Sequence, residues 1–298
     1  MRYRFVTCDV FTDVRFGGNQ LAVFPRATGL TDGQMQQIAR EFNLAETTFV
    51  FPPEAGQTRK VRIFTPACEV PFAGHPNIGT AAMLAAHGEL GDVGQSLSVV
   101  FEEEAGLVPI SIARRPGDRF HCELQAPAPL TLGPEVPAAA VAAAATLTEA
   151  DVVTTTHPPR AGSVGLGFLL TEVRDPATLA RAKPNVAALE RLAREFDQPY
   201  LHLYTHADDG FDLRARQFSA GDPLLEDPAT GSANAALAGL LAHTDRSGRT
   251  AFRWRIAQGV EMGRPSVLEA RAAKRDGRVE AVWIGVEVIG VTDGFLEV

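Results

Sequence analysis

The chain has 298 residues, of which 45% are hydrophobic and 21% are charged, and its formal net charge is −8. This composition is typical of a soluble globular protein with a sizeable core, and the length favours two domains. The acidic balance, without any run of Lys or Arg, argues against a nucleic-acid or membrane partner. We therefore expect a small-molecule ligand.

Neither a membrane anchor nor a disulfide framework is evident. No segment approaches about 18 uninterrupted apolar residues, and the opening "MRYRFVTCDVF" alternates like a strand and does not resemble a signal peptide. Cys8, Cys68 and Cys122 are odd in number and far apart, so they form no CxxC metal site. We expect a cytoplasmic protein whose three thiols are reduced and buried.

The first third of the chain predicts strands around one helix. Residues 3–10 and 20–25 read as strands, joined by the loop "FTDVRFGGN", whose glycines permit a close approach to a ligand. The segment "LTDGQMQQIAREFN" predicts an amphipathic helix that begins after Thr31 or Asp32. The strand "LAETTFVF", which carries Glu46, follows directly.

Further alternating segments, and a helix over residues 186–196, complete an α+β pattern with antiparallel sheets. No GxGxxG opens a helix after the first strand, so a Rossmann unit is not expected. The Pro- and Ala-rich stretch after residue 125 is interpreted as a crossover between two halves. We predict an N-terminal domain over 1–125, completed by a C-terminal strand at about 285–298, and a second domain over 126–284.

A short pattern, ExPxxGxxN, occurs twice. "EVPFAGHPN" begins at Glu69 and "EDPATGSAN" begins at Glu226. Both copies follow a strand with a Phe near its end ("RIFTP", "RQFSA"), and both precede a helix of small residues. Matched letters inside matched flanks indicate a gene duplication.

A loop that runs into a helix start is a natural anion site, because a helix N-terminus leaves N–H groups unpaired and carries about +0.5 elementary charge. Two such starts, one from each half, are expected to converge on one carboxylate-bearing ligand. The alternative for a single copy is an ordinary capped helix, with Asn77 or Ser232 as the cap.

Four side chains near these loops have the chemistry for proton transfer. Glu46 lies among apolar residues and threonines, where burial favours a raised pKa. His75 stands at the first helix start, where burial and the helix dipole favour a neutral imidazole. Asp227 and Ser232 occupy the second loop and helix start. Together they suggest a proton-shuttling site that needs neither a metal nor a cofactor.

The segments "GGNQLAVF", "NLAETTFV", "FTPACEVPFAGHPNIGTA", "EDPATGSANAAL" and "QGVEMGRPS" resemble the motifs of the PhzF-like phenazine-biosynthesis isomerase family across essentially the whole chain. The resemblance implies a diaminopimelate epimerase-like fold. This fold has two pseudo-symmetric domains, each a mostly antiparallel, barrel-like sheet around a central helix, with the active site in the interdomain cleft.

The resemblance also implies a reaction and its residues. Glu46 would be the general acid/base, assisted by His75, Asp227 and Ser232, in the isomerisation of trans-2,3-dihydro-3-hydroxyanthranilate, taking a proton from C3 and returning it to C1. The implied substrate-binding residues are Asn19, Gly74, Pro76, Gly165 and Gly231. No cofactor is implied, and a homodimer is expected.

Three functions remain open at this stage. The related two-thiol racemases carry a cysteine at each central-helix loop, whereas this chain has Ala73 before Gly74 and no cysteine in "EDPATGS". A cofactor-independent isomerase is therefore favoured, with an epimerase or racemase on another amino acid as one alternative. A non-catalytic protein that binds a small anion is the other.

Overall fold

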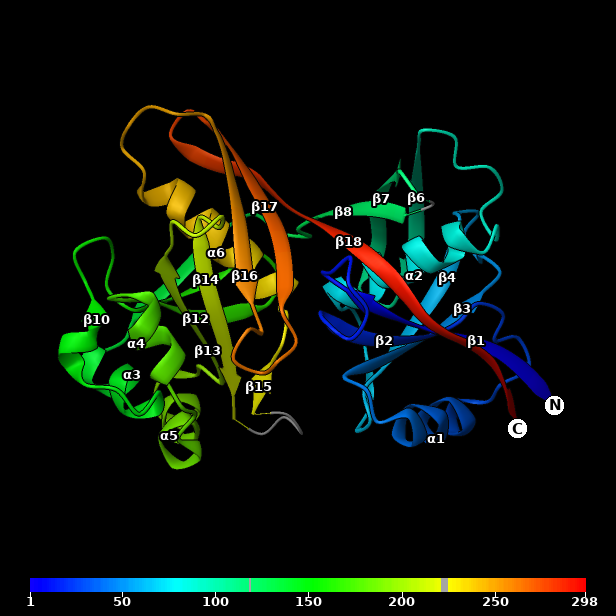
Figure 1. The fold of residues 1–298 in the computed structure, drawn as a ribbon, viewed down its shortest axis with the longest axis horizontal. Helices are drawn as coiled ribbons and strands as arrows, with labels where there is room; N and C mark the ends of the chain where they lie inside the picture. Colours follow the sequence, from blue (N-terminus) through cyan, green and yellow to red (C-terminus); the bar gives the residue numbers. More distant parts are fainter. Residues whose placement is uncertain (118, 221–224) are drawn as a thin grey trace. The chain divides into compact units, whose positions relative to one another are not determined.

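The computed structural model describes residues 1–117, 119–220 and 225–298, and these form two compact units. Unit 1 contains Met1–Gln125 and Gly285–Val298, and unit 2 contains Ala126–Ile284. The long last strand, β18 (Arg278–Glu297), therefore contributes its end to unit 1. Figure 1 shows the course of the chain through each unit.

Unit 1 begins with a strand hairpin and encloses one long helix. Its elements are β1 (Arg2–Val10), β2 (Asn19–Phe24), α1 (Asp32–Phe42), β3 (Glu46–Phe51), β4 (Arg59–Phe64), β5 (Glu69–Val70), α2 (Gly74–Ala86), β6 (Ser96–Glu103), β7 (Gly106–Arg115) and β8 (Arg119–Gln125).

Unit 2 repeats this order with extra helices. Its elements are β9 (Thr131–Glu135), α3 (Ala138–Ala144), the 3-10 turn η1 (Glu149–Asp151), β10 (Val152–Val153), β11 (Arg160–Ser163), β12 (Gly167–Val173), α4 (Pro176–Arg181), α5 (Val186–Phe196), β13 (Tyr200–His206), β14 (Leu213–Ser219), β15 (Glu226–Asp227), α6 (Gly231–Thr244), β16 (Ala251–Gln258) and β17 (Ser266–Arg275).

The strand pairing confirms the duplication. In unit 1, β2 pairs with β3 and β4 pairs with β6 in parallel, while β3 and β4 pair antiparallel. In unit 2, β12 pairs with β13 and β14 pairs with β16 in parallel, while β13 and β14 pair antiparallel. The motif's Glu faces the Phe of the preceding strand in both copies, as Phe64 opposite Glu69 and Phe218 opposite Glu226.

The two small-residue helices form the buried centres of the units. Every residue of α2 from His75 to Ala85 is buried, and so are Gly231 and all residues from Ala233 to Ala242 of α6. At Gly79 the helix approaches β1 and β2 so closely that a Cβ atom would lie 2.5 Å from Leu21 and 2.8 Å from Val10. Small residues are thus needed because each helix is enclosed by strands.

The outer helices follow their sequence signals. Helix α1 begins after Thr31, whose hydroxyl accepts from the Gln34 N–H in a capping box, and it ends at Asn43 in the left-handed region. It covers an aromatic cluster that includes Phe24, Phe49 and Phe64. In unit 2, helices α3, α4 and α5 cover a separate apolar core.

Two sequence expectations need correction. Cys8 and Cys122 are buried, as expected, but Cys68 is exposed. It lies in a turn where its backbone N–H donates to the Thr65 hydroxyl at 3.0 Å, so it does not pack into the core. The Pro- and Ala-rich stretch is more than a crossover, because it contains strand β9, which pairs with β11, and helix α3.

Candidate active site

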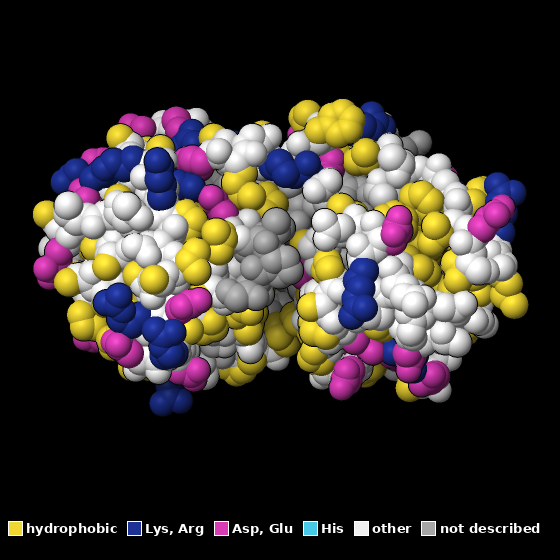
Figure 2. Space-filling view, turned by 90° about the horizontal axis from the view of Figure 1, so that it is seen from below, with side chains coloured by type: hydrophobic (Ala, Val, Ile, Leu, Met, Phe, Trp, Pro, Cys, Tyr) yellow, Lys and Arg dark blue, Asp and Glu magenta, His cyan; other side chains and the backbone are white. Residues whose placement is uncertain are grey.

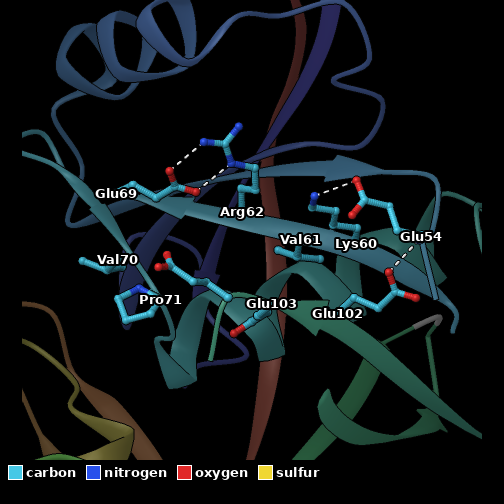
Figure 3. A pocket seen from close by; sticks show the side chains of 10 residues that line it. Glu54, Lys60, Val61, Arg62, Glu69, Val70, Pro71, Glu102 and Glu103 are labelled. Carbon is cyan, nitrogen blue, oxygen red and sulfur yellow. Dashed lines mark hydrogen bonds and ion pairs between the residues drawn. The ribbon is translucent and has the colours of Figure 1, made fainter. Parts of the chain in front are cut away.

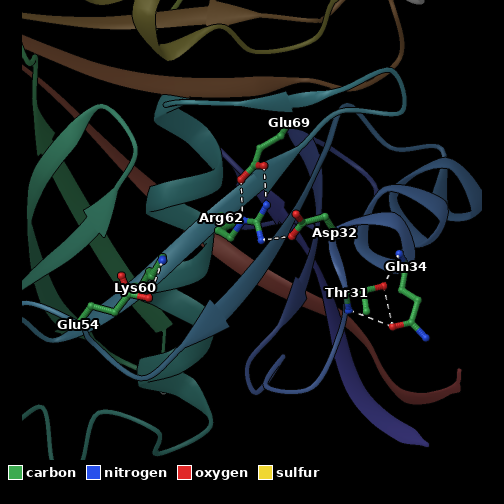
Figure 4. Close-up of polar contacts among 7 residues, drawn as sticks. All are labelled: Thr31, Asp32, Gln34, Glu54, Lys60, Arg62 and Glu69. Atoms are coloured by element: carbon green, nitrogen blue, oxygen red, sulfur yellow. Dashed lines mark hydrogen bonds and ion pairs between the residues drawn. The ribbon is translucent and has the colours of Figure 1, made fainter.

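Each repeat holds its loop in place with an arginine on the preceding strand. In unit 1, Arg62 of β4 makes two hydrogen bonds to Glu69, at 2.7 and 2.6 Å (Figure 4). In unit 2, Arg216 of β14 makes the equivalent two bonds to Glu226, at 2.7 and 2.8 Å. The Glu of the repeated pattern therefore has a structural role. Its ion pair with the arginine, made through two hydrogen bonds, fixes the position of the loop before each helix.

The two helix starts are left open. The residues that precede them, Ala73 and Thr230, make no side-chain cap. The motif asparagines turn back to the same residues, with Asn77 Nδ2 donating to the Ala73 carbonyl at 3.0 Å and Asn234 Nδ2 to the Thr230 carbonyl at 2.9 Å. Capping by Asn77 or Ser232 is therefore wrong, and the N-terminal N–H groups remain suited to an anion.

The structure brings Glu46 and His75 together in unit 1. Glu46 begins strand β3 and His75 follows the first residue of α2, and the distance from Glu46 Oε2 to His75 Nε2 is 3.3 Å. The His75 side chain is almost fully buried, while 19% of the Glu46 side chain is exposed. This leaves the carboxyl group partly open to a ligand while the imidazole supports it from behind.

The imidazole of His75 is neutral. Burial lowers the pKa of His75 from 6.5 to about 4, and a hydrogen bond to the backbone of Gln20 only partly offsets this. This direction agrees with the neutral ring expected from the sequence. Because Nε2 makes no hydrogen bond among the described residues, we assign the ring proton to Nδ1, which donates to Gln20. Nε2 then presents a lone pair toward Glu46.

The other predicted residues of unit 1 lie next to His75 in α2, or on β2, which pairs with β3. Asn19 is buried at the start of β2, next to Gln20, and Gly74 and Pro76 flank His75 in the first turn of α2. The loop before Asn19 is strained, because Phe11 and Phe16 adopt φ angles of 70° and 72°. The Phe16 N–H donates to Asp9 at 2.7 Å, which helps to hold this loop.

The predicted residues of unit 2 form a second group. Asp227 ends β15 and accepts a hydrogen bond from the Thr230 hydroxyl, and Gly231 and Ser232 begin α6. Gly165 lies in the loop before β12. Its φ is 147°, and a Cβ there would lie 2.8 Å from Pro127, so a structural need already explains this glycine.

We use the name first half-site for Glu46, His75 and Asn77 with the loop before α2, and second half-site for Asp227, Ser232 and Asn234 with the loop before α6.

Sequence reasoning missed three side chains at these half-sites. Strand register places Tyr200 of β13 where β3 has Glu46, because Thr47 faces Phe64 and Leu201 faces Phe218. Glu103 and Gln258 end the equivalent strands β6 and β16. Gln258 begins the segment "QGVEMGRPS", but the placement of all three side chains depends on alignment of the two repeats strand by strand.

A surface hollow of about 400 Å³ lies beside the first half-site (Figure 3). Its lining is Glu54, Lys60, Val61, Arg62, Glu69, Val70, Pro71, Glu102, Glu103 and Glu104. Lys60 is already paired with Glu54 at 2.7 Å and Arg62 with Glu69, so the hollow presents mainly negative charge. It includes neither Glu46 nor His75.

The wider surface shows mixed charge. Figure 2 shows basic and acidic side chains interspersed with apolar ones on one face of the molecule. Among the described residues, no group of three or more His, Cys, Asp or Glu side chains is arranged to hold a metal ion. Within the same ranges, no helix has both the length and the apolar character that crossing a membrane requires.

Comparison with known proteins relates this geometry to a family. The family model described as "Phenazine biosynthesis-like protein" matches residues 8–293. The chain is also similar to the trans-2,3-dihydro-3-hydroxyanthranilate isomerase of Pseudomonas aeruginosa. The two are 35% identical over 297 residues, which cover 99% of this chain and 98% of the relative.

Solved structures show the same fold. A PhzF-family phenazine biosynthesis protein of Bacillus anthracis superposes with a TM-score of 0.90 at 22% identity, over 100% of both chains. A hydroxyproline epimerase of Agrobacterium vitis superposes with a TM-score of 0.63 at 18% identity, over 100% of this chain and 91% of that one. The α+β, epimerase-like fold with two similar halves is therefore confirmed.

Proposed function

Because this chain belongs to the phenazine biosynthesis-like protein family and is an isomerase, we propose that it moves a proton between two carbons of a small cyclic carboxylic or amino acid. The proposed substrate resembles trans-2,3-dihydro-3-hydroxyanthranilate, on which the Pseudomonas aeruginosa relative is named to act. The proposed general acid/base is Glu46, without a cofactor.

The observation that carries this proposal is the contact between Glu46 and the neutral ring of His75, 3.3 Å apart at the start of α2. An ionised Glu46 removes a proton from carbon. The protonated carboxyl then donates a hydrogen bond to the lone pair of His75 Nε2, and the carboxyl group delivers a proton to the second carbon. The imidazole needs no change of charge in this cycle, in accord with its low pKa.

The substrate carboxylate has a suitable partner in an uncapped helix start. The N–H groups that open α2 adjoin His75, and those that open α6 adjoin Asp227 and Ser232. We propose that Asn19, Gly74 and Pro76 help to seat the substrate in unit 1, and that Gly165 and Gly231 do so in unit 2. That both half-sites serve one substrate, in a cleft between the units, stays a prediction.

The test is turnover of trans-2,3-dihydro-3-hydroxyanthranilate followed by ultraviolet absorbance. Replacing Glu46→Gln keeps the shape but removes the base, so kcat/KM is expected to fall about 10²- to 10⁴-fold. Glu41→Gln, on the exposed face of α1, is the matched control and is expected to retain full activity. Equal turnover by Glu46→Gln and wild type would exclude this carboxyl as the base.

A further inference from the structure

In the second half-site a single neutral amide holds the helix start and its loop. Gln258 is buried, and its Oε1 accepts from Asn234 Nδ2 at 2.8 Å and from the Thr230 N–H at 3.2 Å. Its Nε2 donates to the carbonyl oxygen of Asp227 at 2.8 Å. The side chain thus needs both an acceptor and a donor to connect α6 to the loop.

In the first half-site the same place is taken by Glu103. It ends β6 as Gln258 ends β16, and both strands run parallel to the strand before the motif. The side chain of Asn77, the counterpart of Asn234, lies beside its carboxyl group. Figure 3 shows Glu102 and Glu103 pointing to different sides of their strand. Val70 occupies the register position that Asp227 has in unit 2, and it lines the same hollow as Glu103.

The carboxyl group of Glu103 is buried, and the nearby Asn77 side chain only partly offsets the cost of ionising it. Neither of its oxygens forms a hydrogen bond among the described residues, and the same holds for Asn77 Oδ1. Leaving a buried carboxylate in this state is costly, whereas a protonated acid has both a donor and an acceptor to offer.

The surrounding charges do not neutralise Glu103. On β4, Lys60 is paired with Glu54 at 2.7 Å, and Arg62 is paired with Glu69 at 2.6 Å and with Asp32 at 2.7 Å.

The remaining ionisable neighbours are either acidic or neutral. Glu102, on the same strand, accepts three backbone N–H bonds, Glu104 is exposed, and His75 on α2 is uncharged. Burial raises the pKa of Glu103 from 4.5 to about 8, and the Asn77 side chain only partly offsets this.

We propose that Glu103 works as a protonated carboxylic acid that does for the first half-site what the Gln258 amide does for the second. Its carbonyl oxygen accepts from Asn77, and its O–H donates to the carbonyl oxygen of Val70. By holding the loop and the first turn of α2, it acts as a positioning residue for His75 and Glu46. This role rests on the function proposed above, whereas the protonation state does not.

Loss of the proton removes the only donor of this side chain and sets a carboxylate oxygen against the Val70 carbonyl. The helix start is then expected to shift, and catalysis to decline, as the pH rises past about 8. Glu103→Gln restores the arrangement of the second half-site and should abolish this alkaline decline.

The catalytic test compares kcat/KM on trans-2,3-dihydro-3-hydroxyanthranilate at pH 7 and pH 9. Wild type is expected to lose about ten-fold over this interval, whereas Glu103→Gln stays nearly constant. Glu103→Leu, which offers neither donor nor acceptor, is expected to lose about 10²-fold at both values because the site is displaced. Glu104→Gln, on the exposed neighbour, should follow wild type.

Two measurements without substrate keep this inference separate from the proposed function. The folded carboxyl keeps its proton up to about pH 8, but the unfolded one loses it near 4.5, so wild type loses stability as the pH rises between these values. The Tm of Glu103→Gln relative to wild type should therefore rise across this window and level off above it. The ring NMR signals of His75 should move near pH 8 in wild type and not in Glu103→Gln.

The outcomes are distinguishable. Suppose that wild type and Glu103→Gln follow the Tm and NMR expectations while wild type does not turn over trans-2,3-dihydro-3-hydroxyanthranilate. In that case the substrate proposal fails and the positioning of His75 by Glu103 stands. If Glu103→Gln retains the pH-dependent Tm of wild type, or if the His75 signals move equally in both, the inference is wrong.

Discussion

The two half-sites share a scaffold but differ in chemistry. Both hold their loop with an arginine–glutamate pair and turn the motif asparagine back to the helix start. Where the first has Glu46, His75 and Glu103, the second has Tyr200, Ser232 and Gln258. The duplication thus preserved the uncapped helix start, while the ionisable groups that suit carbon acid chemistry lie mostly in unit 1.

This asymmetry is informative about mechanism. A racemase removes a proton on one face and delivers one on the other, which calls for a base in each half. An isomerase in which one group takes a proton from one carbon and delivers a proton to another carbon needs one base. The presence of a carboxyl in one half and a phenol at the matching register position in the other favours the second case.

The most direct test of this difference is to remove the Glu46 carboxyl and the Tyr200 hydroxyl in separate variants. Glu46→Gln is expected to lower kcat/KM about 10²- to 10⁴-fold. Tyr200→Phe should cost less than about ten-fold, because a phenol at that place is not required as a base. Steady-state turnover measures the loss of kcat/KM in each variant relative to wild type. Losses of similar size would indicate a two-base site and revive the racemase alternative.

The next effect concerns the free energy of unfolding and the two arginine–glutamate pairs, Arg62–Glu69 and Arg216–Glu226. Arg216 is nearly buried, with 6% of its side chain exposed, and also donates to the carbonyls of Leu179 and Ala182 at 3.0 and 2.8 Å. Arg216→Ala is therefore expected to cost about 3–5 kcal/mol. Arg62 is 23% exposed, so Arg62→Ala should cost about 1 kcal/mol.

Urea unfolding of the two arginine variants provides the check. Because the arginines hold equivalent loops, a difference between them reports burial and the extra carbonyl contacts of Arg216. Equal losses of unfolding free energy would contradict this explanation.

A smaller effect follows from the protonation of His75. Its pKa is about 4 in the folded protein and 6.5 when unperturbed, so between these values the unfolded state binds a proton that the folded state does not. Stability is therefore complete above pH 6.5 and declines as the pH falls toward 4. The loss is on the order of 3 kcal/mol and should be absent in His75→Gln.

Unfolding in urea at pH 7 and pH 4 tests this, with His206→Gln at an exposed position as the control. The stability of wild type relative to His75→Gln should shrink at the lower pH. A constant difference would mean that His75 titrates normally. The corresponding position in unit 2 is Ser232, which has no such dependence and makes the contrast specific to the first half-site.

Much of the fold was accessible from sequence because its signals are local or repeated. The ExPxxGxxN pattern predicted the duplication, and Thr31, one of the two expected start positions, precedes α1 as found. The neutral state of His75 followed from its place at a buried helix start.

Other features depend on contacts that sequence alone does not specify. In "FEEEAG", three consecutive glutamates look alike, and only the register of β6 shows that Glu103 is the one beside Asn77. The strand β9 was missed because its pairing partner, β11, lies in a later segment. Cys68 was misplaced since hydrophobicity favours burial, whereas the Thr65 turn keeps it at the surface.

The most direct test of the central claim, that Glu46 transfers the proton, is incubation with trans-2,3-dihydro-3-hydroxyanthranilate in D₂O followed by NMR of the carbon-bound positions. Wild type is expected to place deuterium at C1 of the product, while Glu46→Gln places none within the same time. Deuterium entering at the wild-type rate in Glu46→Gln would contradict the account.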